Sequence, residues 1–416
     1  MSEPQKIIVI GAGINGVSTA IWLRRAGHDV TLLDKDGPGA GASFGNAGLL
    51  AQWAIIPVNT PGLMKTGLKY LANPKSPLFM QWSYLPKMLP WLIRFLSHAN
   101  EDGARRMIEG LIPILTDSVA QHQALTRGTS AAEFVALSDF SYAYETRAAF
   151  DADSYGWKYR SDAGMAPELI EGPAVQEAEP ILGRRIQCLA VTKDHGHVLN
   201  PGGYLKALAQ VLIEEGGTLR QAEVTDLTLT DGRITSIETD QGSLTCDQAV
   251  LAAGIWSKPL MRKLGLNVPL EAERGHHLHL QNPSQMPRNP MMVTTGKFGV
   301  TPMNDGLRCA GTVELGSIEK GPSRKALDLI RHYIAHTFPD LTYDSAEEWL
   351  GFRPSTPDSL PLIGEIAQTG VHAAFGHQHI GLTAGPKTGR LVADLIEGRR
   401  TNLDLTPYDA NRFGRR

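Results

Sequence analysis

The chain has 416 residues, which is long for a single hydrophobic core and suits two domains. Its 40 Lys and Arg against 43 Asp and Glu give a formal net charge of −3, which argues against a nucleic-acid-binding surface. The three cysteines, Cys188, Cys246 and Cys309, are widely spaced and form no Cys-x-x-Cys zinc or redox motif. With a polar start and no apolar leader, the sequence predicts a cytoplasmic, reduced protein without a signal peptide.

The first fifty residues predict the start of a parallel, doubly wound sheet. Residues 6–10 form an apolar strand, and a glycine-rich turn leads into a helix over residues 15–26 that Gly27 ends. A second strand over residues 30–33 finishes at Asp34. Strand, turn, helix and strand in this order are typical of a βαβ unit.

The turn carries a dinucleotide-binding motif, Gly11-Ala12-Gly13-Ile14-Asn15-Gly16. In a G-x-G-x-x-G loop between a strand and a helix, the first glycine allows the turn and the second admits a pyrophosphate. The third lets helix and strand pack closely. Free N–H groups at the helix N-terminus favour the anion. Asp34, 18 residues after Gly16, is placed to accept hydrogen bonds from a ribose diol.

The rest of the chain alternates between nucleotide-fold patterns and other patterns. Residues 101–130 look helical, Asn200-Pro201 opens an amphipathic helix, and strands follow over residues 221–229, 234–239 and 248–252. The pattern predicts an α/β fold with a doubly wound, Rossmann-like domain over residues 1–54, 190–268 and 353–416. A mixed-sheet α+β substrate domain is expected over residues 55–189 and 269–352.

Two later segments favour FAD over NAD as the dinucleotide. At residues 249–257 an apolar strand meets a small-residue turn containing Ala253 and Gly254, where the backbone can approach a long cofactor a second time. At residues 376–389 a glycine-rich loop opens another helix, whose N-terminus suits an anionic reduced flavin.

Four segments of the sequence resemble the D-amino acid oxidase superfamily of flavoproteins, and within it the bacterial D-amino acid dehydrogenases. They are the N-terminal glycine loop ending at Asp34-Lys35, Ser-Phe-Gly-Asn-Ala-Gly at 43–48, Trp-Leu-Gly-Phe-Arg-Pro-Ser-Thr-Pro-Asp at 349–358, and Gly-His-Gln-His-Ile-Gly at 376–381. The resemblance implies an FAD-binding domain and flavin contacts in these segments. The predicted cofactor-binding residues are Gly11, Gly13, Ile14, Asn15, Gly16, Asp34, Lys35, Ser43, Asn46, Ala47, Gly48, Val224, Ala253, Gly254, Gly376, His377, Gly381, Leu382 and Thr383.

The resemblance also implies where an amino-acid substrate binds. Arg353 lies at the position of the family's substrate arginine and would bind a carboxylate in a bidentate manner; the alternative is an ion pair with Asp358 or Glu365. Arg274 is a second carboxylate candidate or a structural arginine at a strand end. Gln52 and Trp53 follow the first flavin segment, where the family has an active-site lip, although Trp53 equally suits core packing. His379, like His377, would contact flavin or substrate, or hydrogen-bond within its loop.

Other chemistries find little support in the sequence. On a strand, alternation would put only His277 and His279 of the cluster His276, His277 and His279 on one face, which is too few ligands, so no metal site is predicted. No nucleophile elbow is present, and no general base is assigned, because hydride transfer from the α-carbon to flavin N5 relies on the cofactor and on orientation.

The most apolar stretch, residues 77–96, contains three prolines, Lys87 and Arg94 and is not expected to span a bilayer. It predicts either helices that pack domains together or a peripheral membrane contact, since the dehydrogenases that it resembles pass electrons to a membrane respiratory chain. The expected location is the cytoplasm, with contact at the inner face of the plasma membrane.

The sequence as a whole predicts an FAD-dependent dehydrogenase of a D-amino or D-imino acid such as D-alanine, D-proline or a D-hydroxyproline, with a respiratory-chain electron acceptor. Two alternatives stay open: an oxidase of glycine or sarcosine that uses O2, and a flavin-binding subunit of a larger electron-transfer complex. An NAD-dependent dehydrogenase is less favoured.

Overall fold

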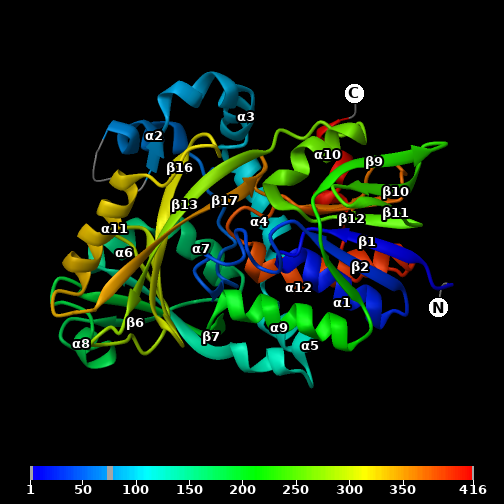
Figure 1. Ribbon diagram of the computed structural model, residues 1–416. Helices are drawn as coiled ribbons and strands as arrows, with labels where there is room; N and C mark the ends of the chain where they lie inside the picture. The colour runs from blue at the N-terminus through cyan, green and yellow to red at the C-terminus, as the bar shows by residue number, and fades with distance from the viewer. Residues whose placement is uncertain (1–2, 73–77, 415–416) are drawn as a thin grey trace.

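The computed structural model of the protein describes residues 3–72 and 78–414, so Pro77 of the apolar stretch lies outside the described residues. The molecule is built around a six-stranded sheet and a ten-stranded sheet. They lie side by side in Figure 1, with the six-stranded sheet next to the N-terminus.

The six-stranded sheet has the order β18-β19-β12-β1-β2-β8 and is parallel except for the pair β18 and β19. Alternate residues of its central strand face two different cores: Ile7 and Val9 pack against helices, and Ile8 and Ile10 pack against a smaller sheet. The strands are β1 (Lys6–Ile10), β2 (Asp29–Asp34), β8 (Thr218–Gln221), β12 (Gln248–Leu251), β18 (Leu362–Glu365) and β19 (Val371–Phe375).

One face of this sheet is covered by α1 (Ile14–Arg25), α9 (Pro201–Glu214) and α12 (Gly381–Ile396). Glycines let α12 lie close to α1, since a Cβ on Gly389 would stand 2.6 Å from the backbone of α1. The other face carries a three-stranded antiparallel sheet of β9 (Val224–Thr230), β10 (Arg233–Thr239) and β11 (Gly242–Thr245), with α10 (Ser257–Lys263) beside it.

The ten-stranded sheet is mixed and has the order β17-β13-β16-β15-β14-β5-β7-β3, with β4 added to β16 and β6 added to β7. The helix α11 (Arg324–Thr337) packs on β13 and β16 through Leu327 and Ile330. The strands are β3 (Leu49–Leu50), β4 (Leu78–Met80), β5 (Val135–Tyr144), β6 (Glu168–Glu171), β7 (Cys188–Val198), β13 (Glu271–Gln281), β14 (Met291–Val293), β15 (Phe298–Met303), β16 (Gly306–Leu315) and β17 (Ser345–Ser355).

The remaining helices are α2 (Leu63–Ala72), α3 (Leu85–Ser97), α4 (Glu101–Leu115), α5 (Ser118–Thr126), α6 (Arg147–Ala152), α7 (Ser154–Asp162) and α8 (Ala174–Ala178). The segment containing α4 and α5 is tied to α12 because Lys387 Nζ lies 2.8 Å from Asp117 Oδ2 and donates to the Pro113 carbonyl at 2.6 Å. Within the described part of the chain, none of the helices combines the length and apolar character needed to cross a membrane.

The predicted α/β class, with a Rossmann-like sheet and a second mixed sheet, is confirmed. Three details differ from the sequence prediction. Residues 190–198, assigned to the nucleotide-binding domain, pair in the ten-stranded sheet as part of β7. The single strand predicted over residues 221–229 is interrupted. Gln221 ends β8 of the six-stranded sheet, the amide of Ala222 donates to the Asp34 carbonyl, and β9 of the three-stranded sheet begins at Val224. Helices α4 and α5, assigned to the substrate domain, pack on α12.

Candidate active site

A cavity of about 620 Å³ is lined by residues of both large sheets. At one end its wall is the glycine loop with the ends of β2 and β12, and at the other it is formed by β13, β16, β17 and the loop 376–381. Fifteen of the predicted cofactor residues line it: Gly11, Gly13, Ile14, Asn15, Asp34, Lys35, Ser43, Asn46, Ala47, Val224, Ala253, Gly254, His377, Gly381 and Leu382.

The glycine loop needs glycine at positions 11 and 16 because other backbone atoms lie very close to both. Gly11 has a φ of +104°, and a Cβ there would lie 2.7 Å from the Ala252 carbonyl oxygen at the end of β12. A Cβ on Gly16 would lie 1.8 Å from the Gly11 carbonyl oxygen, so Gly16 allows α1 to start directly against the turn. A side chain at Gly11 would displace the end of β12, and a side chain at Gly16 would displace α1 from the turn.

Polar groups around the loop suit a dinucleotide. Asp34 accepts from Ala12 N at 2.7 Å with one oxygen and from Asp36 N and Gly37 N with the other, which fixes its carboxylate at the end of β2. Ser43 Oγ accepts from Ile14 N, the first amide of α1, at 3.0 Å. Asn15 Oδ1 is buried and has no partner in the described chain, an acceptor that a hydroxyl-bearing ligand can satisfy.

The 43–48 segment is attached to the ten-stranded sheet by three side chains. His277 Nδ1 lies 2.9 Å from the Gly45 carbonyl, Arg308 Nη1 donates to Phe44 and Asn46 carbonyls, and Thr301 Oγ1 donates to the Ala47 carbonyl. Burial, and then the charge of Arg308, lower the pKa of His277 to about 3, so a neutral imidazole donates this bond. The segment is therefore held rigidly between the two sheets.

Glycines make room for an indole beneath this segment. Trp349 stacks on His277 with ring centroids 5.1 Å apart. A Cβ on Gly45 would lie 2.2 Å from the Trp349 ring, and one on Gly351 would lie 1.9 Å from it. Trp349 lines the cavity, so the glycines of both the 43–48 and the 349–358 segments admit a flat ring at the cavity wall.

The 376–381 loop joins the two helices of the dinucleotide end. His377 Nδ1 lies 3.0 Å from Asn15 Nδ2, and His377 Nε2 lies 2.9 Å from Thr388 Oγ1. Burial lowers the pKa of His377 to about 3, which fits a neutral ring that accepts at Nδ1 and donates at Nε2. Of the two roles open for His377, hydrogen bonding within the fold is present, and it also lines the cavity.

Four predicted cofactor residues do not line the cavity and support the backbone around it. Gly16 acts as described above, and Gly48 and Gly376 have φ values of +73° and +86°. Thr383 Oγ1 accepts from Ala51 N at 3.1 Å and ties α12 to the residues after β3. Their direct contact with a cofactor stays a prediction.

Arg353 lies in the cavity wall at the opposite end from Asp34. Its Nη1 donates to the Thr312 carbonyl at 3.2 Å, and a Cβ on Gly275 would lie 2.5 Å from Nη2. Thr312 has a φ of +69° where the pairing of β13 and β16 skips a residue between Arg274 and His276. This bulge turns the Thr312 carbonyl toward the guanidinium, a use of bulges known beside active sites.

The alternative role for Arg353, an ion pair with Asp358 or Glu365, is absent among the described residues, and Asp358 pairs with Arg412 at 2.7 Å. Burial lowers the pKa of Arg353, while the charge of Glu273 acts in the opposite direction. A guanidinium stays protonated even so. Because no other hydrogen bond of the described chain uses its N–H groups, Arg353 is available to an anion in the cavity.

Trp53 and His379 both line the cavity, and Gln52 does not. Trp53 stacks on Phe140 at 4.4 Å, so it is both a core residue and a cavity wall. Gln52 donates to the Asp194 carbonyl at the surface, and its contact with the substrate stays a prediction. His379 is exposed to the cavity. Burial inside the protein, and then the charge of Arg353, lower its pKa to about 4.

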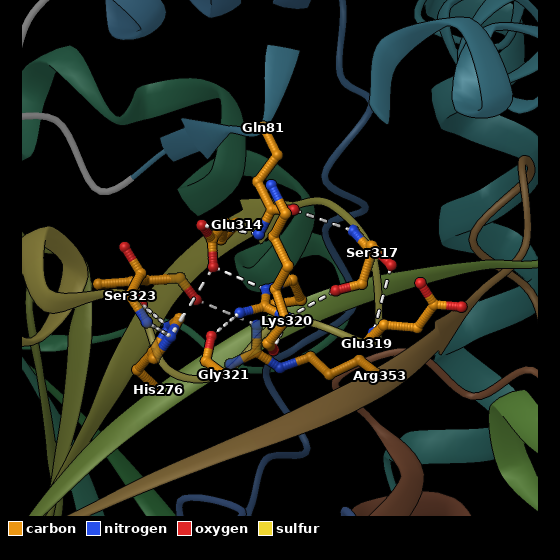
Figure 2. A network of polar contacts seen from close by, with 11 residues as sticks. Gln81, His276, Glu314, Ser317, Glu319, Lys320, Gly321, Ser323 and Arg353 are labelled. Atoms are coloured by element: carbon orange, nitrogen blue, oxygen red, sulfur yellow. Dashed lines mark hydrogen bonds and ion pairs between the residues drawn. The ribbon is translucent and has the colours of Figure 1, made fainter. Parts of the chain in front are cut away.

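Arg274 is not the second carboxylate contact predicted from sequence. It is fully buried outside the cavity lining, and Nε donates to Glu314 at 2.7 Å while Nη1 and Nη2 donate to the carbonyls of Ser317, Lys320 and Gly321. Figure 2 shows the partners of this guanidinium, Ser317, Lys320 and Gly321, gathered in one loop, with Arg353 beneath them. Alternation along β13 turns Arg274 to the opposite side from Glu273.

Residues 6–395 match the family described as FAD dependent oxidoreductase (DAO). The chain belongs to this family. A D-amino-acid oxidase of Bradyrhizobium diazoefficiens is 38% identical and covers 99% of the chain and all of its own length. D-amino acid dehydrogenases of Methylobacterium nodulans and Rhizobium rhizogenes are 30% and 27% identical, the first covering 96% of both chains and the second 98% of this chain and all of its own.

Solved structures with the same fold include glycine oxidase from Geobacillus kaustophilus, with a TM-score of 0.77, 22% identity and coverage of 99% of both chains. L-proline dehydrogenase from P. horikoshii has a TM-score of 0.73 at 19% identity and covers 99% of this chain and 98% of its own. At these identities the likeness concerns the fold alone.

The cofactor of this DAO-family enzyme is FAD, and the residues at the dinucleotide end fit it. Gly11 and Gly13 carry no side chains in front of the α1 N-terminus, and Asp34 lies at the end of β2. Asn15 Oδ1 accepts no hydrogen bond from the part of the chain that the structure describes. Bound FAD supplies the hydride acceptor. The described His, Cys, Asp and Glu side chains form no group able to hold a metal ion, and the three histidines of β13 bind protein groups.

Sequence reasoning missed Glu273, His277, Arg308 and Trp349 as parts of this site. The sequence shows the three histidines as a cluster, and the period-two alternation of β13 could have shown that His277 shares a face with Glu273. The opposing partners of these residues on β16 and β17 had no local signal.

Proposed function

We propose that the protein is a dehydrogenase of D-amino or D-imino acids that transfers a hydride from the substrate α-carbon to flavin N5. The observation that carries the proposal is Arg353, a guanidinium in the cavity wall that is bonded only to the Thr312 carbonyl within the described chain. Such a group binds a carboxylate strongly. The names of the relatives, which act on D-amino acids, support the stereochemistry.

The side chains at this end orient and enclose the substrate. Arg353 fixes the carboxylate, while Trp53 and Trp349 provide flat apolar walls that suit a small aliphatic or cyclic side chain such as that of D-alanine, D-proline or a D-hydroxyproline. Met292 and Val313 add to the apolar lining. Holding the α-carbon against the cofactor and excluding water contribute to the rate without a dedicated nucleophile.

The proposed electron acceptor is a component of a respiratory chain, reached through peripheral contact with the inner face of the plasma membrane. Four large apolar side chains on α2, the turn before α3 and α3 are exposed: Met64 at 63%, Trp82 at 64%, Leu89 at 44% and Ile93 at 60%. Lys65, Lys69, Lys87 and Arg94 lie among them, a combination that suits an anionic lipid surface.

Vesicle flotation tests this surface. Ile93→Glu should abolish binding to anionic vesicles, and Ile213→Glu on α9, equally apolar and 44% exposed, should leave it unchanged. Wild-type protein that stays away from anionic vesicles would contradict the membrane proposal and leave the catalytic one intact.

A second candidate is an oxidase that passes electrons directly to O2, since the Bradyrhizobium relative is named an oxidase. Anaerobic flavin reduction followed by reoxidation separates the two. Purified holoenzyme is mixed with D-alanine, D-proline, cis-4-hydroxy-D-proline, sarcosine, glycine and L-amino acids while the visible flavin band is followed. Bleaching by D-amino or D-imino acids, with slow reoxidation in air, supports the dehydrogenase. Fast reoxidation with peroxide supports the oxidase, and bleaching by none of them overturns the proposal.

A further inference from the structure

Glu273 is a buried acid in the cavity wall beside Arg353. It is 3% exposed and lines the cavity, and it lies on β13 directly opposite Arg353 on β17. Directly paired residues of antiparallel strands point to the same face, with Cβ atoms about 5 Å apart. The two side chains therefore offer one negative and one positive group to the same part of the cavity.

One carboxylate oxygen of Glu273 is held, and the other is open. Ser355 Oγ donates to Glu273 Oε1 at 2.8 Å, and Gln378 Nε2 donates to Ser355 Oγ at 2.9 Å, which orients the serine hydroxyl toward the acid. Within the described chain no hydrogen bond or ion pair reaches Oε2. Arg353 uses Nη1 on the Thr312 carbonyl and makes no ion pair with Glu273.

Two other buried acids nearby show that this arrangement is particular to Glu273. Glu271 binds Lys258 at 2.7 Å and Tyr84 at 3.0 Å, and Glu314 binds Arg274 at 2.7 Å and Gln81 at 3.2 Å. Each has a cation of the chain beside it, as burial of a carboxylate requires. Glu273 differs from both: the charge of Arg353 acts on it, but Arg353 makes no ion pair with it, and no group of the described chain binds Oε2. Because Glu273 lines the cavity, we expect a ligand to supply that donor.

We propose that Glu273 Oε2 binds the positively charged α-nitrogen of the substrate while Arg353 binds its carboxylate. The inference rests on the proposed function in one respect, that the substrate is an amino or imino acid. A zwitterion carries its two charges on neighbouring atoms of one small skeleton. The neighbouring acid and guanidinium of β13 and β17 match that pair in sign and in closeness.

The same oxygen can take the proton that must leave before oxidation. A protonated nitrogen has no lone pair to form the C=N bond as the α-hydrogen departs with its electron pair. An N–H bond of the substrate breaks and an O–H bond to Oε2 forms, with no change in oxidation state. Burial raises the pKa of Glu273, while the charge of Arg353 acts in the opposite direction. A raised pKa makes the Glu273 carboxylate a better proton acceptor.

The other titratable groups around Glu273 have different roles. Arg353 faces it from β17, and His379, whose pKa is lowered to about 4, lines the cavity from the loop 376–381. Lys258 of α10 and Tyr84, just before α3, are engaged with Glu271. His379 is thus neutral at pH 7, which leaves Glu273 as the acid that meets the substrate nitrogen.

Two ligands that differ only in the nitrogen test the assignment without turnover. 2-Aminoisobutyrate has the ammonium and the carboxylate but no α-hydrogen, and isobutyrate lacks the nitrogen; each is titrated into oxidised holoenzyme while the flavin spectrum is followed. Glu273→Gln should weaken 2-aminoisobutyrate binding about 10- to 100-fold and leave isobutyrate unchanged or tighter. Glu271→Gln, on the same strand face but outside the cavity lining, should change neither. Equal effects of Glu273→Gln on both ligands, or wild-type enzyme that prefers neither, would overturn the assignment.

Two further measurements separate binding from structural damage. Glu273→Asp, with the charge kept and shortened by one methylene, should restore part of the affinity for 2-aminoisobutyrate. For a substrate that reduces the flavin, the deficit of Glu273→Gln should shrink as the pH approaches the pKa of the substrate ammonium; a deficit that does not change with pH overturns the proton step. If no amino acid reduces wild-type flavin but the ligand preference holds, the proposed function fails and the nitrogen site stands.

Discussion

The two ends of the cavity are built in different ways. At the dinucleotide end the geometry is made by backbone: Gly11 and Gly16 lie in one loop, and the nearest atoms to an added Cβ are carbonyl oxygens. At the substrate end it is made by side chains, where Arg353, Glu273 and Ser355 meet across β13 and β17. A backbone site tolerates no added atom, whereas a side-chain site depends on charge, and this difference gives each end its own response to mutation.

The largest effect is expected for Gly11→Ala. The new Cβ would stand 2.7 Å from the Ala252 carbonyl at a φ of +104°, so β12 or the turn must move and FAD should no longer be retained. Gly27→Ala is the matched control, since Gly27 has a φ of +100° but nothing within 4 Å of its Cβ. It should cost about 1 kcal/mol of stability and keep the flavin. The flavin-to-protein ratio after gel filtration, with circular dichroism, measures both; equal loss of flavin in the two variants would contradict the distinction.

Arg274→Lys should affect stability and leave ligand binding alone. The lysine cannot reach Glu314 and the carbonyls of Ser317, Lys320 and Gly321 together, and about 3 kcal/mol of unfolding free energy should be lost at roughly 1 kcal/mol for each bond. Denaturant unfolding of the apoprotein gives the stability, and isobutyrate titration of the holoenzyme gives the affinity. A large drop in affinity at unchanged stability would return Arg274 to the carboxylate site.

Arg353→Lys should show the reverse behaviour. A point charge replaces the planar fork, so isobutyrate should bind about 10- to 100-fold more weakly while FAD content and unfolding midpoint stay close to wild type. The reason is that Arg353 makes a single hydrogen bond to the described chain, to Thr312. Arg274→Lys should lose stability and Arg353→Lys should lose isobutyrate affinity. If both variants lose the same one of these two properties, the proposed difference between the two arginines is wrong.

The contrast between the two ends also explains what the sequence could predict. The strand, turn and helix of the glycine loop are adjacent in sequence, and the contact of Gly16 with the Gly11 carbonyl is local, so the motif and its ligand class were visible. The contact of Gly11 with Ala252 is distant in sequence and was not visible. The βαβ unit and the α9 helix followed from hydrophobic period, and the class of both sheets was predicted correctly.

Register between distant strands was invisible. Arg274 and Arg353 look alike as arginines in predicted strands. Alternation and a bulge at Thr312 send Arg274 into the 317–321 loop and Arg353 into the cavity. Glu273 gave no signal in the sequence, because its proposed role depends on Arg353 opposite and on Oε2, which no group of the described chain binds. The resemblance to a family identified Arg353, and only the pairing of β13 with β17 separated it from Arg274.

The smallest expected effect concerns acid. Burial lowers the pKa of His377 to about 3, well below the value of about 6.5 in an unfolded chain. Between these values the unfolded chain binds one proton more, so the stability due to the neutral ring is present above pH 6.5 and falls by about 1.4 kcal/mol per pH unit as the pH drops from there toward 3. In His377→Gln apoprotein, the fall of the unfolding free energy per pH unit over this range should be smaller by about 1.4 kcal/mol.

His277→Gln is the partner measurement, because His277 has a pKa lowered to about 3 as well but ties the 43–48 segment to the ten-stranded sheet. If the protein unfolds as one unit, both variants should reduce the same transition by a similar slope. If the dinucleotide end opens first, the His377 variant should change the earlier transition, since His377 joins Asn15 to Thr388 within that end. A wild-type slope in the His377 variant would mean that the ring is charged in the folded protein, and the hydrogen bonds that join α1 to α12 would have to be assigned anew.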